Sequence, residues 1–171
     1  MKQAAGHVAQ AAATLLAETL PNAAYPGNVL VVAGSGGNGG DGLYAGAELA
    51  RAGHHVEAIR VGTRIHERAA AAFEHAGGQF VTKLGDYDLV IDGIIGLGGS
   101  KGLSDDVATL LARCAGTPIL AIDVPSGINP DTGVPMGAHI TATATVTFGA
   151  LRYAHAVSPA CGEVVVGDIG I

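Results

Sequence analysis

The sequence has 171 residues, of which 49% are hydrophobic and only 4% aromatic, which is enough for the core of one domain. Its formal net charge is −6, so we expect no large basic surface of the kind that binds nucleic acid. It contains no signal peptide and no apolar segment of about twenty residues that could span a membrane. Cys114 and Cys161 lack the spacing of a metal or redox motif. We therefore expect a cytoplasmic protein that binds neither membranes nor nucleic acid.

Helical and strand patterns alternate along the chain. An amphipathic helix is expected from Lys2 to Glu18, and Pro21 and Pro26 mark the turn after it. The segments that follow are strand Asn28–Ala33, helix Leu43–Ala52, strand His55–Gly62, helix Arg64–Ala76, strands Gln79–Thr82 and Asp88–Ile95, helix Asp105–Cys114, and strands Pro118–Val124, Thr143–Phe148 and Glu163–Ile169.

The order of these elements is similar to that of a doubly wound α/β sheet in a single domain spanning residues 1–171. Continuous apolar runs such as Leu89–Ile91 and Ile119–Ile122 indicate parallel strands that are buried on both faces. We expect a loop containing Arg152 and Pro159 to join the last two strands.

The segment GSGGNGGDG, residues 34–42, joins the first strand to the helix after it. Gly34, Gly36 and Gly39 fit the GxGxxG pattern of a dinucleotide loop, with Glu57 near the distance of a ribose-binding carboxylate. Asp41 opposes a simple pyrophosphate cradle, because a carboxylate at a helix N-terminus repels phosphate bound in the same place.

Each polar residue at this edge of the sheet has a structural and a functional interpretation. Asp41 could be an N-cap and Asn38 could adopt a left-handed turn. Asp92 and Asp123 directly follow apolar strands, where each could end its strand by accepting backbone hydrogen bonds. A buried carboxylate is costly without hydrogen bonds or a cation, so two such aspartates at one edge favour a ligand site.

Two other kinds of catalytic site are disfavoured. Ser126 lies between Pro125 and Gly127 and therefore does not fit the GxSxG pattern of a serine hydrolase. The seven histidines, including the pair His54 and His55, lack zinc-site spacing with a carboxylate.

The motifs together resemble one known family over effectively the entire chain. The family pattern GxGNNGGDG is similar to Gly34–Gly42, its strand aspartate and following loop to Asp92 and Gly96–Lys101, and its D[IV]PSG to Asp123–Gly127. DTG, VTFG and DIG recur at residues 131–133, 146–149 and 168–170. The chain thus resembles the YjeF N-terminal domain family, the NAD(P)H-hydrate epimerases.

The resemblance implies a three-layer α/β/α, Rossmann-like fold with a mostly parallel sheet, and an isomerase that interconverts the R and S hydrates of NADH or NADPH. It implies a potassium ion with side-chain ligands Asn38, Asp92 and Ser126. Asp123 would be the catalytic acid or base, with Lys101 stabilising or relaying charge opposite it. The residues that would contact substrate are Gly37, Asn38, Gly39, Gly40, Asp41, Gly96, Leu97, Gly98, Gly99, Ser100, Gly102 and Asp123.

The resemblance also implies a homodimer that works with, or is fused to, a kinase-like dehydratase. The apolar stripe of the first helix, which includes Val8, Ala12 and Leu16, belongs either to the core or to that dimer interface. In one departure, Gly37 replaces the first asparagine of the family pattern. Two alternatives remain: a non-catalytic module on the same scaffold that makes protein or RNA contacts, and an NAD(P)-dependent oxidoreductase.

Overall fold

The structure, a computed structural model, describes residues 2–20 and 26–170, so the predicted turn at Pro21 lies outside the described residues. Its strands are β1 (Asn28–Ala33), β2 (His55–Arg60), β3 (Gln79–Phe80), β4 (Leu89–Gly93), β5 (Ile119–Ile122), β6 (Ala144–Phe148) and β7 (Glu163–Gly167). Its helices are α1 (Lys2–Thr19), α2 (Gly37–Arg51), α3 (Glu67–His75), α4 (Asp105–Ala112) and α5 (Tyr153–Val157), with a 3₁₀ turn η1 (Pro159–Cys161). None of the described helices is long and apolar enough to cross a membrane.

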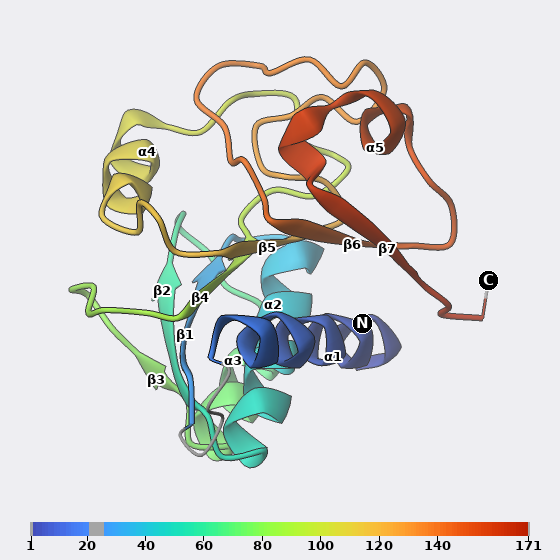
Figure 1. The fold of residues 1–171 in the computed structure, drawn as a ribbon. Coiled ribbons are helices and arrows are strands. Elements are labelled where there is room, and N and C mark those ends of the chain that lie inside the picture. The colour runs from blue at the N-terminus through green and yellow to red at the C-terminus, as the bar shows by residue number, and fades with distance from the viewer. Residues whose placement is uncertain (1, 21–25, 171) are drawn as a thin grey trace.

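The seven strands form one parallel sheet in the order β3-β2-β1-β4-β5-β6-β7 (Figure 1). This confirms the expected Rossmann-like sheet. The chain passes from β1 outward to β2 and β3, and then returns to the other side of β1 to form β4. The strand order therefore reverses between β1 and β4. Ligands of open α/β sheets bind at such a point, beyond the carboxyl ends of the strands.

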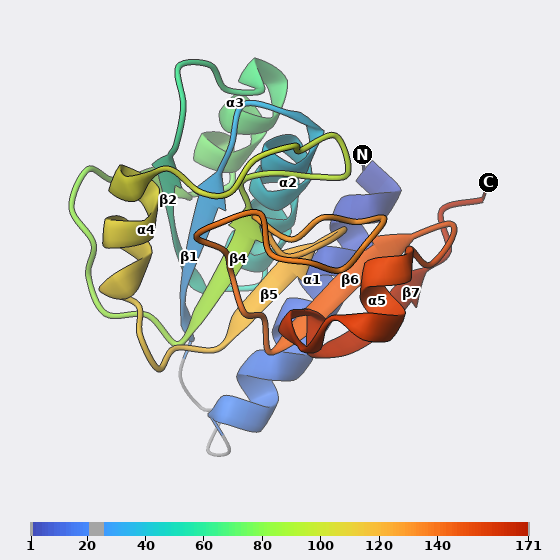
Figure 2. The same cartoon turned by 90° about the horizontal axis from the view of Figure 1, so that it is seen from above.

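Helices cover both faces of the sheet, which confirms the three layers (Figure 2). Successive strand residues point to opposite faces, so Val31 packs in the core under α1, α2 and α3 while Val32 packs in the core beside α4. Val8, Ala12 and Leu16 are buried in the first of these cores. The apolar stripe of α1 therefore belongs to the core of this chain.

Helix α2 begins at Gly37, so the prediction that this helix starts at Leu43 was wrong. Glycine has a low helix propensity, which made the segment look like a loop. Tertiary packing overrides that propensity, because Gly42 and Gly46 lie where a Cβ would come within 3.2 and 3.1 Å of Val31. The glycines let α2 lie close to the sheet, and they bring residues 38–42 into its first turns.

The segment between β6 and β7 was also predicted wrongly, as a loop. It contains the single helical turn α5 and the 3₁₀ turn η1. Ala154 of α5 is fully buried against Val124, Ile128 and Cys161. A helix of five residues is too short to give a periodic pattern, so tertiary packing rather than sequence periodicity defines it.

Candidate active site

The carboxyl ends of β1 and β4 meet at the point where the strand order reverses. The Gly34 N–H donates to the Gly93 carbonyl at 3.0 Å and joins the two loops that follow these strands. Between the loops lies a cavity of about 440 Å³. It is lined by Ser35, Gly36, Gly37, Asn38, Ile94, Ile95, Gly96, Leu97, Gly98 and Gly99. Two motifs that are about 60 residues apart in the sequence thus form one crevice, as predicted from the topology.

Glycine is required in this crevice because the backbones touch. A Cβ at Gly34 would lie 1.9 Å from the Ile94 carbonyl oxygen, and one at Gly39 would lie 2.0 Å from the Gly34 carbonyl oxygen. No side chain fits at such distances. The bare loop therefore allows the N-terminus of α2 to approach the segment after β4.

Asp92 and Ser126 form a buried hydrogen-bonded pair at the base of the site, each only 1% exposed. The Ser126 hydroxyl and N–H donate to the two Asp92 oxygens at 2.6 and 2.8 Å. The Ile94 N–H donates to Asp92 at 3.2 Å, and the Ile95 N–H donates to Ser126 Oγ at 3.0 Å. Burial raises the pKa of Asp92, while the hydrogen bonds from Ser126 and Ile94 oppose that shift. Asp92 thus accepts backbone hydrogen bonds at its strand end, as one interpretation held, and also belongs to a polar cluster.

Asn38 lies in the first turn of α2 and is 7% exposed. Its Nδ2 donates to the Ile122 carbonyl at 2.8 Å, which links α2 to the end of β5. Its Oδ1 lies against Gly96, where a Cβ would come within 2.6 Å. Asn38 is helical, so the suggested left-handed turn at this position was wrong.

The oxygen atoms of Asn38, Asp92 and Ser126 fit a hard cation. All three side chains are buried, and the groups that donate to Asp92 are neutral hydroxyl and N–H groups. A cation beside this carboxylate would compensate its charge, and carboxylate, hydroxyl and amide oxygens are the donors that hard cations prefer.

Asp123 follows β5 and is the one described non-glycine residue with a positive φ, at 66°. Its carbonyl accepts a hydrogen bond from His155 Nε2 of α5 at 2.6 Å. Burial raises the pKa of Asp123, whereas the nearby His155 and Arg152 lower it. The residue is therefore held at the rim in an unusual backbone conformation, with a carboxyl group that is disposed to take up a proton.

Asp41 lies in α2, close enough to Asp123 for the charge of the Asp123 carboxylate to affect the pKa of Asp41. Burial raises the pKa of Asp41 to about 6; the Asp123 carboxylate adds to the shift, and His66 opposes it. The N-cap of α2 is Gly36, so the interpretation of Asp41 as the N-cap was wrong. Two partly buried carboxyl groups from α2 and the end of β5 thus lie near one another.

Only some of the other predicted site residues line the cavity. Gly96, Leu97, Gly98 and Gly99 line the cavity. Gly40 packs behind the loop, where a Cβ would lie 3.1 Å from the His66 ring. Ser100 and Lys101 are exposed beyond the lining segment, and Gly102 packs against the backbone of residues 136–138.

Sequence reasoning missed His155 and His66, which lie near the two carboxyl groups. His66 carried a weak signal, since it precedes a helix and caps it by accepting from the Ala69 N–H. His155 gave no signal, because its role depends on a helix that the sequence did not predict. Glu57, the suggested ribose ligand, lies in the middle of β2 and accepts a hydrogen bond from the Tyr87 hydroxyl.

Fold and site together define a class: a Rossmann-like α/β protein with a ligand crevice at the carboxyl edge of its sheet and an acidic, oxygen-rich cluster beside it. Residues 1–154 match the family described as YjeF-related protein N-terminus. The chain belongs to this family.

The chain is also similar to proteins named for NAD(P)H-hydrate repair. The chain is 44% identical over 198 residues to the bifunctional NAD(P)H-hydrate repair enzyme Nnr of Corynebacterium glutamicum, an alignment that covers 100% of this chain and 34% of that enzyme. It is 38% identical over 193 residues to the NAD(P)H-hydrate epimerase of Clavibacter michiganensis subsp. michiganensis, covering 98% of this chain and 84% of that protein. The chain spans about a third of the length of the bifunctional relatives.

A solved structure supports the fold. The crystal structure of yeast ynu0 superposes with a TM-score of 0.78 at 19% sequence identity, covering 97% of this chain and 76% of the yeast chain. The three-layer architecture is therefore shared at low sequence identity.

Proposed function

We propose that the chain is an NAD(P)H-hydrate epimerase, an isomerase that interconverts the R and S hydrates of NADH and NADPH. One observation carries the proposal: Asn38, Asp92 and Ser126 come from three separate segments, yet Ser126 hydrogen-bonds to Asp92, and Asn38, which lines the crevice, hydrogen-bonds to the Ile122 carbonyl next to Asp123. The names of the relatives in Corynebacterium and Clavibacter support the same substrate.

The crevice would hold the hydrated nicotinamide and its phosphates between two glycine-rich segments. Backbone N–H groups near the start of α2 favour an anionic group, and the bare walls at Gly36, Gly37 and Gly98 leave room for it. We infer that a potassium ion binds to Asn38, Asp92 and Ser126. When bound, it would compensate the Asp92 charge and help to orient substrate oxygens.

Asp123 is the proposed acid and base. The hydrated carbon is a hemiaminal, so removing the proton from its hydroxyl and placing one on the ring nitrogen breaks the C–N bond, whose electron pair goes to nitrogen. The product is an open-chain aldehyde and amine, and the reverse step on the other face gives the epimer with no net redox change. The raised pKa of Asp123, caused first by burial, suits a group that must both accept and return a proton. Loss and return of water at the same carbon is the alternative route.

Four further residues complete the proposal. Burial raises the pKa of Asp41 to about 6 and the nearby Asp123 charge adds to that shift, so we propose that Asp41 takes part in the proton transfers of the site. Lys101 is proposed to stabilise charge opposite Asp123, and its support is its place two residues beyond the lining glycines. Ser100 and Gly102 are proposed contacts in the same segment.

The proposed setting is a cytoplasmic homodimer in nicotinamide-nucleotide repair. The epimer that it forms would pass to a dehydratase specific for the S hydrate, whether separate or fused. The bifunctional relatives support such a coupling.

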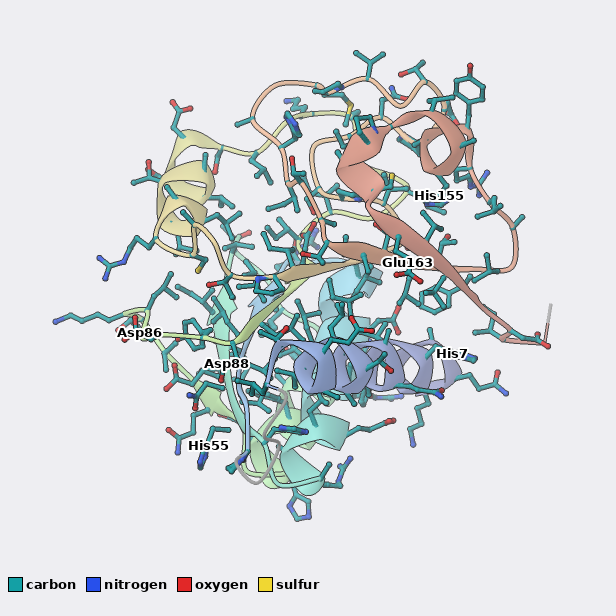
Figure 3. The ribbon with its side chains drawn as sticks, viewed as in Figure 1. His7, His55, Asp86, Asp88, His155 and Glu163 are labelled. Carbon is teal, nitrogen blue, oxygen red and sulfur yellow. The ribbon has the colours of Figure 1, made fainter. Side chains whose placement is uncertain are left out.

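The test is chromatographic monitoring of pure R hydrate with the purified chain, with and without potassium. The proposal expects accelerated appearance of the S form, and it expects Asp123→Asn to slow that conversion by about 10²- to 10⁴-fold. Asp86→Asn is the matched control, because Asp86 is exposed in the loop that enters β4 at the opposite edge of the sheet (Figure 3).

Other outcomes would favour the rival functions. Conversion no faster than the uncatalysed rate, in either salt, would contradict the proposal and leave a binding module on this scaffold. Hydride transfer with NAD(P), detected as a change in absorbance, would indicate an oxidoreductase instead.

A further inference from the structure

The backbone of Asp123 needs support. A φ of 66° places it in the left-handed region, which is costly for a residue with a Cβ. Its N–H still pairs with the Val146 carbonyl of β6 at 2.7 Å, and the next N–H, from Val124, turns back to the Ile122 carbonyl at 2.9 Å. These bonds leave the Asp123 carbonyl directed away from the sheet ladder, where it requires a donor of its own.

That donor is His155. The Asp123 carbonyl lies 2.6 Å from Nε2 of this half-buried imidazole. At the other ring nitrogen, Nδ1, the ring accepts a hydrogen bond from the Arg152 N–H at 2.9 Å. Because Nδ1 is an acceptor, the ring proton is on Nε2, where it donates to Asp123.

Helix α5 holds His155 rigidly enough for this task. The residue before it, Ala154, is fully buried and donates its N–H to the Pro130 carbonyl at 3.1 Å. The His155 N–H donates to the Arg152 carbonyl at 3.1 Å, so the short turn is bonded at both ring and backbone. The imidazole is therefore fixed relative to the segment 123–130 that carries Asp123.

We propose that His155 is a positioning residue for the epimerase: its Nε2–H holds the Asp123 carbonyl and thereby fixes the backbone that orients the Asp123 carboxylate. This inference rests on the proposed function. In this proposal His155 acts through Asp123 and not on the reacting atoms.

The test compares His155→Ala, His155→Gln and the matched control His75→Ala, whose exposed side chain ends α3. With hydrate as substrate, His155→Ala lowers kcat by about 10- to 100-fold and leaves KM within about threefold, because the catalytic group is misplaced while the binding walls remain. His155→Gln recovers much of kcat, since its amide N–H can reach the same carbonyl. His75→Ala behaves as wild type.

A double variant tests whether His155 affects kcat through Asp123. In the Asp123→Asn background, the proposal expects His155→Ala to lower kcat no further. An unchanged kcat in His155→Ala, no recovery in His155→Gln, or an equal loss in the Asp123→Asn background would each overturn the positioning role. Circular dichroism of every variant monitors folding, and His155→Gln keeps the test decisive if the alanine variant unfolds.

A readout independent of activity separates this inference from the proposed function. Imidazole ¹⁵N spectra of the wild-type chain should show His155 protonated at Nε2 and bare at Nδ1. The opposite tautomer would overturn the contact whatever the activity. If the spectra agree but wild type does not epimerise hydrate, then the proposed function has failed, and the catalytic role of His155 fails with it while its bond to Asp123 stands.

Discussion

Replacing Gly96 by alanine tests the central cluster with one methyl group. A Cβ at this position would lie 2.6 Å from Asn38 Oδ1, closer than side-chain carbons approach in proteins, so the amide must shift. Asn38 is buried and its Nδ2 is held by the Ile122 carbonyl, so this movement strains or breaks the hydrogen bond. Overpacking costs about 1–3 kcal/mol and the loss of a hydrogen bond about 1 kcal/mol, which predicts a fall of about 2–4 kcal/mol in the free energy of unfolding.

The assay is urea unfolding in potassium chloride and in a salt without potassium. Gly98→Ala is the control from the same segment, because a Cβ there meets nothing within 4 Å, and it should stay within about 0.5 kcal/mol of wild type. Potassium should stabilise wild type and Gly98→Ala, and it should stabilise Gly96→Ala less. If Gly96→Ala matches Gly98→Ala in both salts, Asn38 is not held against Gly96 as described.

Three further predictions concern the glycine loop and the buried carboxyl groups of the site. Gly39→Ala should unfold or lose several kcal/mol, since its Cβ would lie 2.0 Å from the Gly34 carbonyl oxygen, whereas Gly36→Ala, in open space, should behave as wild type in thermal melts. Asp41 should titrate near pH 6 by ¹³C NMR, because its pKa is raised from 3.8. Between these two values the folded chain binds more protons than the unfolded chain, so wild type loses stability as pH rises. Asp41→Asn lacks this loss and should therefore gain stability relative to wild type from about pH 4 to about pH 7. A midpoint near 4 would refute this. Asp92→Asn should abolish stabilisation by potassium, which in wild type reaches about 2.7 kcal/mol at a hundredfold excess over Kd. If potassium raises the melting temperature of Asp92→Asn as much as that of wild type, Asp92 is not a ligand.

Local sequence patterns were sufficient to predict the sheet and the edge that carries the site. The apolar runs before Asp92 and Asp123 indicated strands buried on both faces, and parallel strands place their carboxyl ends together. The position of both aspartates at one rim followed from that geometry, without any knowledge of their contacts.

The connections within the site could not be predicted in the same way. The Asp92–Ser126 pair joins residues 34 positions apart, and it depends on the conformations of the loops that follow β4 and β5. Helix α2 begins among glycines because close packing on β1 outweighs their poor helix propensity. The bond from His155 to Asp123 requires both a left-handed backbone and a five-residue helix, and neither leaves a periodic signal.

A crystal of the chain grown with rubidium in place of potassium and soaked with NADPH hydrate tests the central claim most directly. The account predicts an anomalous peak among the oxygens of Asn38, Asp92 and Ser126, with the nicotinamide in the adjoining crevice and its hydrated carbon next to Asp123. A peak elsewhere, or hydrate bound in the cavity of about 260 Å³ between α1 and β7, would contradict it.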